Sequence, residues 1–200
     1  MRKMYLSAPL PFVGQKRMFA KEFMKVLEQY PDGTLFVDLF GGSGLLSHIT
    51  KSLKPHSTVI YNDFDNYRFR MKHIPQTNQL LADIREMVGN SVPRHKIIKG
   101  ELRERIFSRI EQEENSTGYV DFITLSSSIL FSMKYKLSVQ DMRKEALYNN
   151  IRKTGYPECA DYLEGLEIVS CDYKDAGLGS LHFRWGFFFF HRRDAPVLQV

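Results

Sequence analysis

A glycine-rich loop directly after Asp38 has the composition of a small-ligand site. Residues 35–40 form a short apolar run typical of a strand, residues 41–44 read Gly-Gly-Ser-Gly, and residues 45–53 have a helical pattern. Glycines allow a sharp turn and close approach of a ligand, and the start of the helix presents free N–H groups. The loop lacks the Gly-Lys-Ser/Thr of a P-loop and the G-x-G-x-x-G spacing of a dinucleotide site. An acid at the strand end therefore favours a cationic ligand, such as an amino group or a sulfonium; the alternative is a purely structural turn.

A second acidic position lies about twenty residues further on, at Asn62-Asp63. It follows the β-branched run 58–61, and an acid at the end of the second strand of such a unit accepts hydrogen bonds from both ribose hydroxyls. The alternative is the N-cap of a helix, because Asn and Asp are common there. Combined with the glycine loop, the ribose interpretation is favoured. The two motifs together describe a site for an adenosine with an amino-acid end, namely S-adenosylmethionine (SAM).

The elements that must position these residues are predicted as a βαβ unit. A helix over 18–29 precedes the first strand, and the order strand, glycine loop, helix, strand predicts a parallel sheet of the α/β class. Ligands of open α/β sheets bind at the carboxyl ends of the strands, so Asp38, Asp63 and Asp172 are expected to face one crevice. Further elements are predicted in one set: helices over 65–88 (broken at Pro75), 101–114 and 138–152, and strands over 118–125 and 166–171.

Composition narrows the function classes. The chain has 200 residues, 43% hydrophobic and 26% charged, with a net charge of +5, which fits a polyanionic partner. Two cysteines build neither a disulfide framework nor a four-ligand zinc site, so no metal is expected and a reducing, cytoplasmic setting is the default. No stretch approaches the roughly 18 apolar residues of a membrane span, so no membrane partner is expected.

Three ordered motifs resemble one family. Residues 8–16 (APLPFVGQK), 36–44 (FVDLFGGSG) and 61–63 (YND) are similar to the opening of the Dam-type, or α-class, N6-adenine DNA methyltransferases. The resemblance is strong over residues 5–66 and weaker over 165–175. It implies a Rossmann-like SAM-dependent methyltransferase sheet, incomplete at its C-terminal side, with a mostly helical target-recognition insertion. The implied division is a SAM-binding half over 1–93, a target-recognition region over 94–164, and a return to the sheet over 165–200.

The resemblance also implies roles for individual residues. Phe12 and Lys16 would contact the methionine part of SAM, with Lys16 near its carboxylate, and Asp63 would bind the ribose. Asp172 and Tyr173 resemble the pair that holds the adenine ring; the alternative for them is an exposed strand end. The residues expected to enclose the methionine moiety are Asp38, Phe40, Gly41, Gly42, Ser43 and Gly44.

A basic segment lies inside the region implied to recognise the target. Residues 130–155 hold six basic side chains against two acidic ones, with Tyr135, Tyr148 and Asn149-Asn150 between them. Phosphate contacts from Lys and Arg give affinity for DNA, whereas contacts to base edges give specificity. The alternative is a solvated basic surface. The candidate DNA-binding residues are Lys134, Lys136, Arg143, Lys144, Arg152 and Lys153.

The sequence departs from the family at the catalytic motif. The family has D-P-P-Y, which orients the amine of a flipped adenine and stacks on the base. This chain has Asp194-Ala195-Pro196-Val197, so Asp194, Ala195 and Pro196 are the catalytic candidates, and Val197 cannot stack. The segment from about residue 176 is expected to be altered or truncated relative to an intact enzyme.

Three functions remain open at this point. The first is methyl transfer from SAM to N6 of adenine in double-stranded DNA, by a protein acting as a monomer, with a restriction endonuclease as a companion partner. The alternative is a homologue that binds SAM or DNA without turnover. A methyltransferase for RNA or a small molecule is a third interpretation, which the basic segment disfavours.

Overall fold

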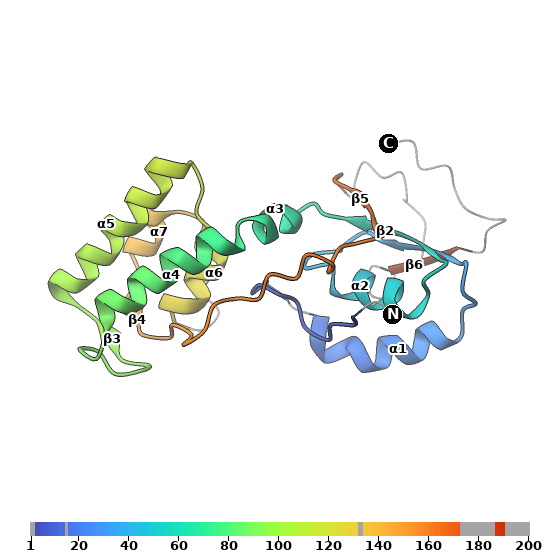
Figure 1. Cartoon of the computed structure of the whole chain (residues 1–200), viewed down its shortest axis with the longest axis horizontal. Helices are drawn as coiled ribbons and strands as arrows, with labels where there is room; N and C mark the ends of the chain where they lie inside the picture. The colour runs from blue at the N-terminus through green and yellow to red at the C-terminus, as the bar shows by residue number, and fades with distance from the viewer. Residues whose placement is uncertain (1–2, 15, 132–133, 173–186, 191–200) are drawn as a thin grey trace. The chain divides into compact units, whose positions relative to one another are not determined.

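The computed structural model describes residues 3–14, 16–131, 134–172 and 187–190, and it forms two compact units (Figure 1). The first unit consists of the chain up to Ala8, Gly14–Phe69, and the chain from Cys159 onward. The second unit consists of Pro9–Val13 and Arg70–Glu158. The sequence placed the corresponding boundaries near residues 94 and 164, inside and beyond the second unit.

The first unit is built on a sheet whose described strands are β1 (Leu35–Asp38), β2 (Thr58–Asn62), β5 (Glu167–Val169) and β6 (Phe187–Phe190), in the order β5-β2-β1-β6. β1 pairs with β2 in parallel, and β2 pairs with β5 in parallel. This confirms the α/β class and the parallel pairing of the βαβ unit. β6 runs antiparallel to β1.

Two helices cover one face of this sheet. α1 (Ala20–Glu28) follows a short 3-10 turn, η1 (Lys16–Phe19), and α2 (Leu45–Leu53) follows the glycine loop, as predicted. Figure 1 shows α1 and α2 on the same side of the sheet. Their apolar side chains join those of both central strands in one cluster: Ala20, Phe23, Leu27, Phe36, Leu45, Leu46, Ile49 and Val59. Burial of this cluster holds the glycine loop between two fixed elements.

The N-terminal arm is fastened to the first unit through a buried histidine. The N–H of Tyr5 donates to Nε2 of His48 at 2.9 Å, and Nδ1 of His48 lies 2.7 Å from the Tyr162 carbonyl. Because Nε2 accepts a hydrogen bond, Nδ1 carries the proton and donates it. The His48 ring stacks on the Tyr162 ring, with centroids 4.7 Å apart. α2 therefore holds both the arm and the segment that leads to β5.

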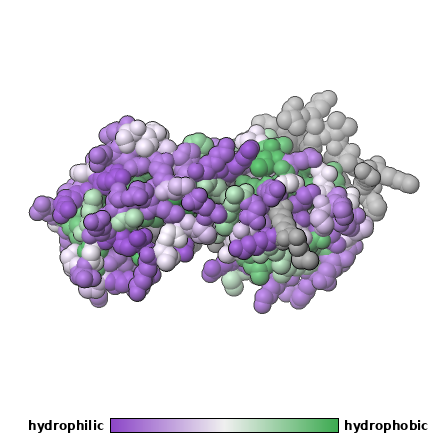
Figure 2. Space-filling view, in the orientation of Figure 1, coloured by the Kyte–Doolittle hydropathy of each residue, from purple (hydrophilic) through white to green (hydrophobic). Residues whose placement is uncertain are grey.

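The second unit is mostly helical. Its helices are α4 (Ile74–Val88), α5 (Gly100–Thr117), α6 (Phe122–Ile129) and α7 (Val139–Arg143), and α3 (Tyr67–Lys72) leads into it. A two-stranded antiparallel sheet joins β3 (Ile97–Ile98) to β4 (Leu147–Tyr148). On the face seen in Figure 2, the outer surface of this unit is largely hydrophilic.

A buried ion pair anchors this unit. Nε of Arg70 lies 3.1 Å from Asp121 Oδ1, and both side chains are almost completely buried. Arg70 also donates to the Pro11 carbonyl at 2.8 Å and so holds the segment Pro9–Val13. A charge buried at this depth is stable only when it is paired.

Two predicted elements are wrong. The strand expected over 118–125 is helix α6, because Asp121 caps its start by accepting from the N–H of Thr124 at 3.0 Å. Residues 138–152 are not one helix: α7 ends at Arg143, and residues 147–148 pair with β3 instead. In both places capping and long-range pairing outweigh the local pattern.

Candidate functional site

The glycine loop of the first unit needs its glycines for two different reasons. Gly42 and Gly44 have φ of +52° and +68°, which side chains other than glycine rarely adopt. The N–H of Gly44 donates to the Gly41 carbonyl at 2.8 Å, and this closes a tight turn before α2. The loop thus brings the backbone of residues 41–44 to the carboxyl end of β1.

Gly41 is required by packing and not by its backbone angles. A Cβ at this position would lie 2.2 Å from Cε2 of Tyr61 and 2.7 Å from the Asn62 carbonyl oxygen. Both distances are far inside van der Waals contact. The loop therefore rests directly on the ring of Tyr61, a fully buried residue of β2.

Asp38 ends β1 with its side chain completely buried. Oδ2 accepts from the hydroxyl of Ser47, in the first turn of α2, at 2.7 Å. Oδ1 accepts no hydrogen bond and lies 3.5 Å from Nζ of Lys16, which itself donates to the Phe40 carbonyl at 2.5 Å. Burial raises the pKa of Asp38, while Lys16 and Ser47 act in the opposite direction. The site thus holds a carboxylate with one oxygen ready for a further donor.

Asp63 follows β2 and caps α3. Its Oδ1 accepts from the N–H of Tyr67 at 2.6 Å and its Oδ2 from the N–H of Arg68 at 3.0 Å. The hydroxyl of Tyr61 also lies within hydrogen-bond distance of Oδ1, at 3.0 Å. Burial raises the pKa of Asp63, and the hydrogen bonds from Arg68, Tyr61 and Tyr67 oppose that rise. The capping alternative considered from the sequence is therefore realised, and it uses most of the acceptor capacity of this carboxylate.

Asn62 joins three strand ends at this edge of the sheet. Its amide nitrogen donates to the carbonyls of Leu39 at 3.0 Å and Cys171 at 2.9 Å, and its Oδ1 accepts from the N–H of Cys171 at 3.0 Å. This pairing places Asp172 beside the ends of β1 and β2. The structure therefore brings Asp38, Asp63 and Asp172 to one edge of the sheet, as the parallel order requires.

The remaining predicted residues for the ligand do not all lie in this unit. Phe12 belongs to the second unit, in the segment held by Arg70. Tyr173 lies outside the described residues, as do the catalytic candidates Asp194, Ala195 and Pro196.

The direction of β6 bears on the catalytic motif. Phe187 pairs with Asp38, and Phe190 pairs with Leu35, so the chain leaves β6 at the amino end of β1. This is the edge opposite the glycine loop. A motif that follows a strand parallel to β1 would instead begin at the carboxyl edge.

Three residues at the carboxyl edge were missed by sequence reasoning. Tyr61 and Asn62 were quoted only as part of a motif. In the structure the ring of Tyr61 packs under Gly41 of the loop, and the amide of Asn62 donates to the Leu39 carbonyl just before it. Phe64, directly after Asp63, is 57% exposed, and Phe40 is 40% exposed. The signal available for Phe64 in the sequence was an aromatic residue directly after the acid that ends the second strand.

In the second unit, most of the predicted DNA-binding residues are already paired. Lys134 and Lys136 both contact Glu145, at 2.5 and 3.1 Å, and Lys144 contacts Asp141 at 2.7 Å. The guanidinium of Arg152 lies over the ring of Tyr156 at 4.4 Å. Lys153 is exposed and has no ion pair among the described residues.

Among these basic side chains, Arg143 is held by three contacts. It contacts Glu104 at 2.7 Å and Glu111 at 3.0 Å, and it lies 4.5 Å from the centre of the Phe107 ring. All three partners belong to α5. Arg143 therefore ties α7 to α5, and a phosphate group would have to displace two carboxylates to reach it.

Exposed basic side chains are also found around the small sheet of the second unit. Arg94, Lys96 and Lys99 flank β3, and Arg152 and Lys153 follow β4. The ladder continues beyond the strands, since the N–H of His95 donates to the Asn149 carbonyl at 2.8 Å. These basic side chains therefore lie beside one short antiparallel pair of strands, which folding joins from distant parts of the chain.

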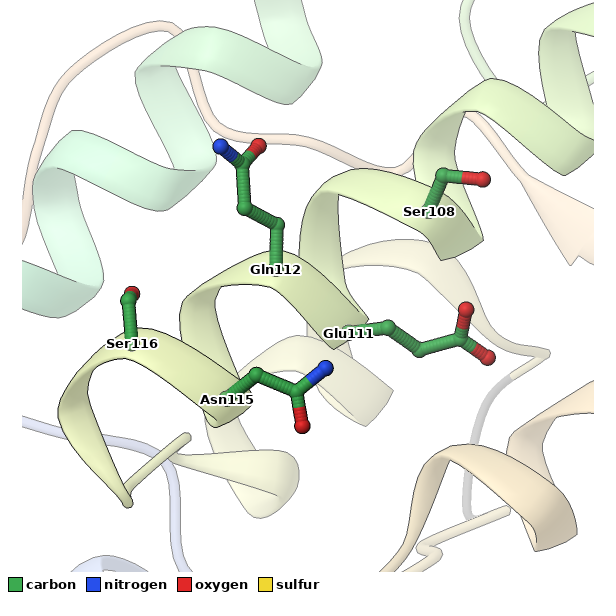
Figure 3. A pocket seen from close by; sticks show the side chains of 5 residues that line it. All are labelled: Ser108, Glu111, Gln112, Asn115 and Ser116. Atoms are coloured by element: carbon green, nitrogen blue, oxygen red, sulfur yellow. The ribbon is translucent and has the colours of Figure 1, made fainter.

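A shallow hollow on α5 has no matching chemistry. It is lined by the polar side chains of Ser108, Glu111, Gln112, Asn115 and Ser116, all from one helix (Figure 3). Among the described residues, no group of three or more His, Cys, Asp or Glu side chains could hold a metal ion. Within the same residues, no helix is both long and apolar enough to cross a bilayer.

Comparison with known proteins gives one relative. Over 173 residues the chain is 41% identical to a Haemophilus influenzae protein named "Putative methyltransferase". The alignment covers 84% of this chain and 57% of that protein, so the chain spans a little over half the length of the curated relative. No protein-family model matches the chain. No solved structure matches it.

Proposed function

We propose that this chain binds SAM through its first unit and belongs to a methyltransferase acting on N6 of adenine in DNA. The observation that carries the proposal is the meeting of Asp38, Asp63 and Asp172 around a glycine loop at the carboxyl edge of parallel strands. The identity to a Haemophilus influenzae protein named as a methyltransferase supports the same reaction class.

The amino-acid end of SAM fits the surroundings of Asp38. Oδ1 of this carboxylate is buried and accepts no hydrogen bond, so the ammonium group of a ligand can donate to it. Lys16 is close enough to balance the carboxylate of the same ligand. The backbone of residues 41–44 completes the enclosure, because its glycines leave no side chain in the way.

The adenosine end is proposed to meet Asp63, Phe64 and Asp172. Asp63 has acceptor capacity left for one ribose hydroxyl, since its two oxygens already receive backbone N–H groups and face the hydroxyl of Tyr61. Phe64 offers an exposed ring for the adenine, and Asp172 an acceptor for its amine. When bound, SAM supplies the electrophilic methyl group.

DNA is the proposed substrate because the second unit carries most of the net positive charge of the chain, with 15 Lys and Arg against 11 Asp and Glu. Exposed ion pairs such as Lys134 with Glu145 are weak, so a phosphate can compete for these lysines. The basic side chains beside β3 and after β4 have no carboxylate partner among the described residues, and we place the main phosphate contacts there: Arg94, Lys96, Lys99, Arg152 and Lys153. A flipped adenine would present its amine to Asp194, with the carbonyl of Ala195 and Pro196 completing the motif.

A second candidate function is SAM or DNA binding without turnover. The replacement of D-P-P-Y by Asp-Ala-Pro-Val at 194–197 favours it.

Tritiated methyl transfer from SAM to unmethylated DNA, with calorimetric SAM binding measured beside it, separates the two functions. Incorporation that disappears in Asp194→Ala supports the enzyme. SAM binding without incorporation supports the second candidate. Asp63→Asn is expected to weaken SAM binding, whereas Asp65→Asn, at an exposed neighbour, is the matched control. Absence of SAM binding by the wild-type protein overturns the enzyme, and of the second candidate it leaves only DNA binding.

A further inference from the structure

Tyr61 supports the glycine loop from below. It lies near the end of β2, is fully buried, and its Cε2 and Cδ2 atoms come within 2.2 and 2.3 Å of where a Cβ of Gly41 would be. Its Cζ atom lies 3.3 Å from the corresponding position on Gly44. The ring is therefore the surface on which both ends of the loop rest.

The hydroxyl of Tyr61 lies within hydrogen-bond distance of two acceptors in the candidate site. Its oxygen lies 2.7 Å from the Gly42 carbonyl and 3.0 Å from Oδ1 of Asp63. A phenol has one proton, so it donates fully to only one of them at a time. Donation to Asp63 stabilises the charged carboxylate, whereas donation to Gly42 fixes the loop and withdraws that support.

Asp63 depends on few other donors. The backbone N–H groups of Tyr67 and Arg68 hold one lone pair on each oxygen, at 2.6 and 3.0 Å. No other side chain donates to it within the part of the chain that the structure describes. Of the side chains that the structure describes, Tyr61 is thus the one that hydrogen-bonds to both the loop and this carboxylate.

We propose that Tyr61 is a positioning residue that links the conformation of the glycine loop to the charge state of Asp63. The inference rests on the proposed SAM site, because the loop would hold the amino-acid end of SAM and Asp63 its ribose. A ligand that moves the Gly42 carbonyl changes which acceptor receives the phenolic proton. The two ends of the ligand are then bound cooperatively although they contact different strands.

Other charged and titratable groups face this pair and are kept constant in its test. Asp65 lies on the loop beyond β2 and raises the pKa of Asp63, and Arg68 contributes through its backbone N–H. Asp38 on β1 and Tyr162 before β5 both act on Tyr61 and raise its pKa. None of them bonds to Gly42 and Asp63 together, so removal of the Tyr61 hydroxyl isolates the link.

The first test is a carbon-13 NMR titration of the Asp63 carboxyl in ligand-free protein. Tyr61→Phe keeps the ring and removes the proton, so the pKa of Asp63 rises above its wild-type value and the Gly42 carbonyl resonance moves. Tyr30→Phe, which removes the hydroxyl of a partly buried tyrosine of the same unit, leaves both unchanged. An Asp63 titration that is the same in wild type and Tyr61→Phe overturns the proposal.

A reverse variant protects the test against a Tyr61→Phe protein that does not fold. Asp63→Asn weakens the second acceptor, so the phenolic proton shifts to Gly42 and the Gly42 carbonyl resonance moves. A Gly42 resonance that ignores Asp63→Asn overturns the link as well.

The second test is SAM affinity as a function of pH. Tyr61→Phe is expected to bind SAM about tenfold more weakly than wild type, the usual effect of losing one hydrogen bond to a charged group. The difference grows as the pH falls, because less of Asp63 is ionised in the variant. A loss that is the same at every pH indicates a merely structural role and counts against the link. Wild-type protein that binds no SAM refutes the proposed function, and the Asp63 titration still decides the link.

Discussion

The pKa values of carboxyl groups are shifted in opposite directions in the two units. At the sheet edge of the first unit, burial raises the pKa of Asp38 and Asp63. On the surface of the second unit, hydrogen bonds from basic side chains lower the pKa of Glu104, Asp141 and Glu145, from Arg143, Lys144 and Lys134 respectively. The charged form of the carboxyl group is therefore disfavoured by burial in the first unit and stabilised by basic partners in the second.

The difference separates residues that are placed for a ligand from residues that hold a fold. A carboxylate that is stabilised by its own protein gains little from a ligand cation, whereas a buried one with a raised pKa and an open oxygen gains much. Asp38 is of the second kind, since its Oδ1 accepts no hydrogen bond. Four of the six basic residues that the sequence assigned to DNA are held by acids of the first kind: Glu104 and Glu111 on α5, Asp141 on α7, and Glu145 just after it.

The largest effect is expected where the first unit is most tightly packed. Gly41→Ala lowers its free energy of unfolding by about 3 kcal/mol, because the new Cβ meets the Tyr61 ring and the Asn62 carbonyl. Scanning calorimetry measures the loss. Gly33→Ala is the control: it has a φ of +92° but nothing within 4 Å, so it costs only the backbone strain, about 1 kcal/mol. Equal losses in the two variants contradict the packing argument.

Asp38→Asn is expected to show the cost of the buried carboxylate. The folded pKa of Asp38 is raised above its ordinary value of 3.8, so the folded state binds the proton more tightly than the unfolded state. Stability linked to this group therefore falls as the pH rises from about 4 through the folded pKa. In thermal unfolding between pH 4 and 7, the stability of the variant relative to wild type should increase as the pH rises. Asp65→Asn is the control. A variant that loses stability relative to wild type as the pH rises contradicts the assignment.

Arg143→Ala tests whether this base serves the fold or the DNA. Loss of its contact with the Phe107 ring and two glutamates costs about 1 kcal/mol of stability in the second unit. The salt dependence of DNA affinity should barely change. Lys153→Ala is the matched opposite: stability is unchanged, and the slope of log affinity against log salt falls by about one. The reverse pattern would return the DNA contact to Arg143.

The smallest effect is expected for Lys144→Ala. Its ion pair with Asp141 joins two exposed side chains three residues apart. Such a pair contributes almost nothing to stability, so the unfolding midpoint should not move measurably. The pKa of Asp141 should rise toward its ordinary value, because the hydrogen bond from Lys144 is the main cause of its lowering. NMR titration of Asp141 reads this change directly.

Local signals were sufficient for the βαβ unit and failed in the second unit. The apolar runs before Gly41 and Asn62, with a helix between them, specify parallel strands by themselves. The run Gly118–Leu125 is equally rich in β-forming residues, yet Asp121 turns it into a helix that packs beside Arg70. Lys134, Arg143 and Lys144 look like a free basic surface in the sequence, since their acidic partners on α5 or within the same segment become partners only through folding.

The sequence by itself determined the class of the sheet, the glycine loop and the acids that reach its carboxyl edge. Those features depend on residue types and short spacings, which can be recognised in the sequence without knowledge of the fold. Only the tertiary structure decided that Asp63 caps α3, that Tyr61 lies under Gly41, and that β6 runs antiparallel to β1. These are relations between atoms on different strands and helices. Their outcome depends on how buried surfaces fit together, and no local pattern contains that information.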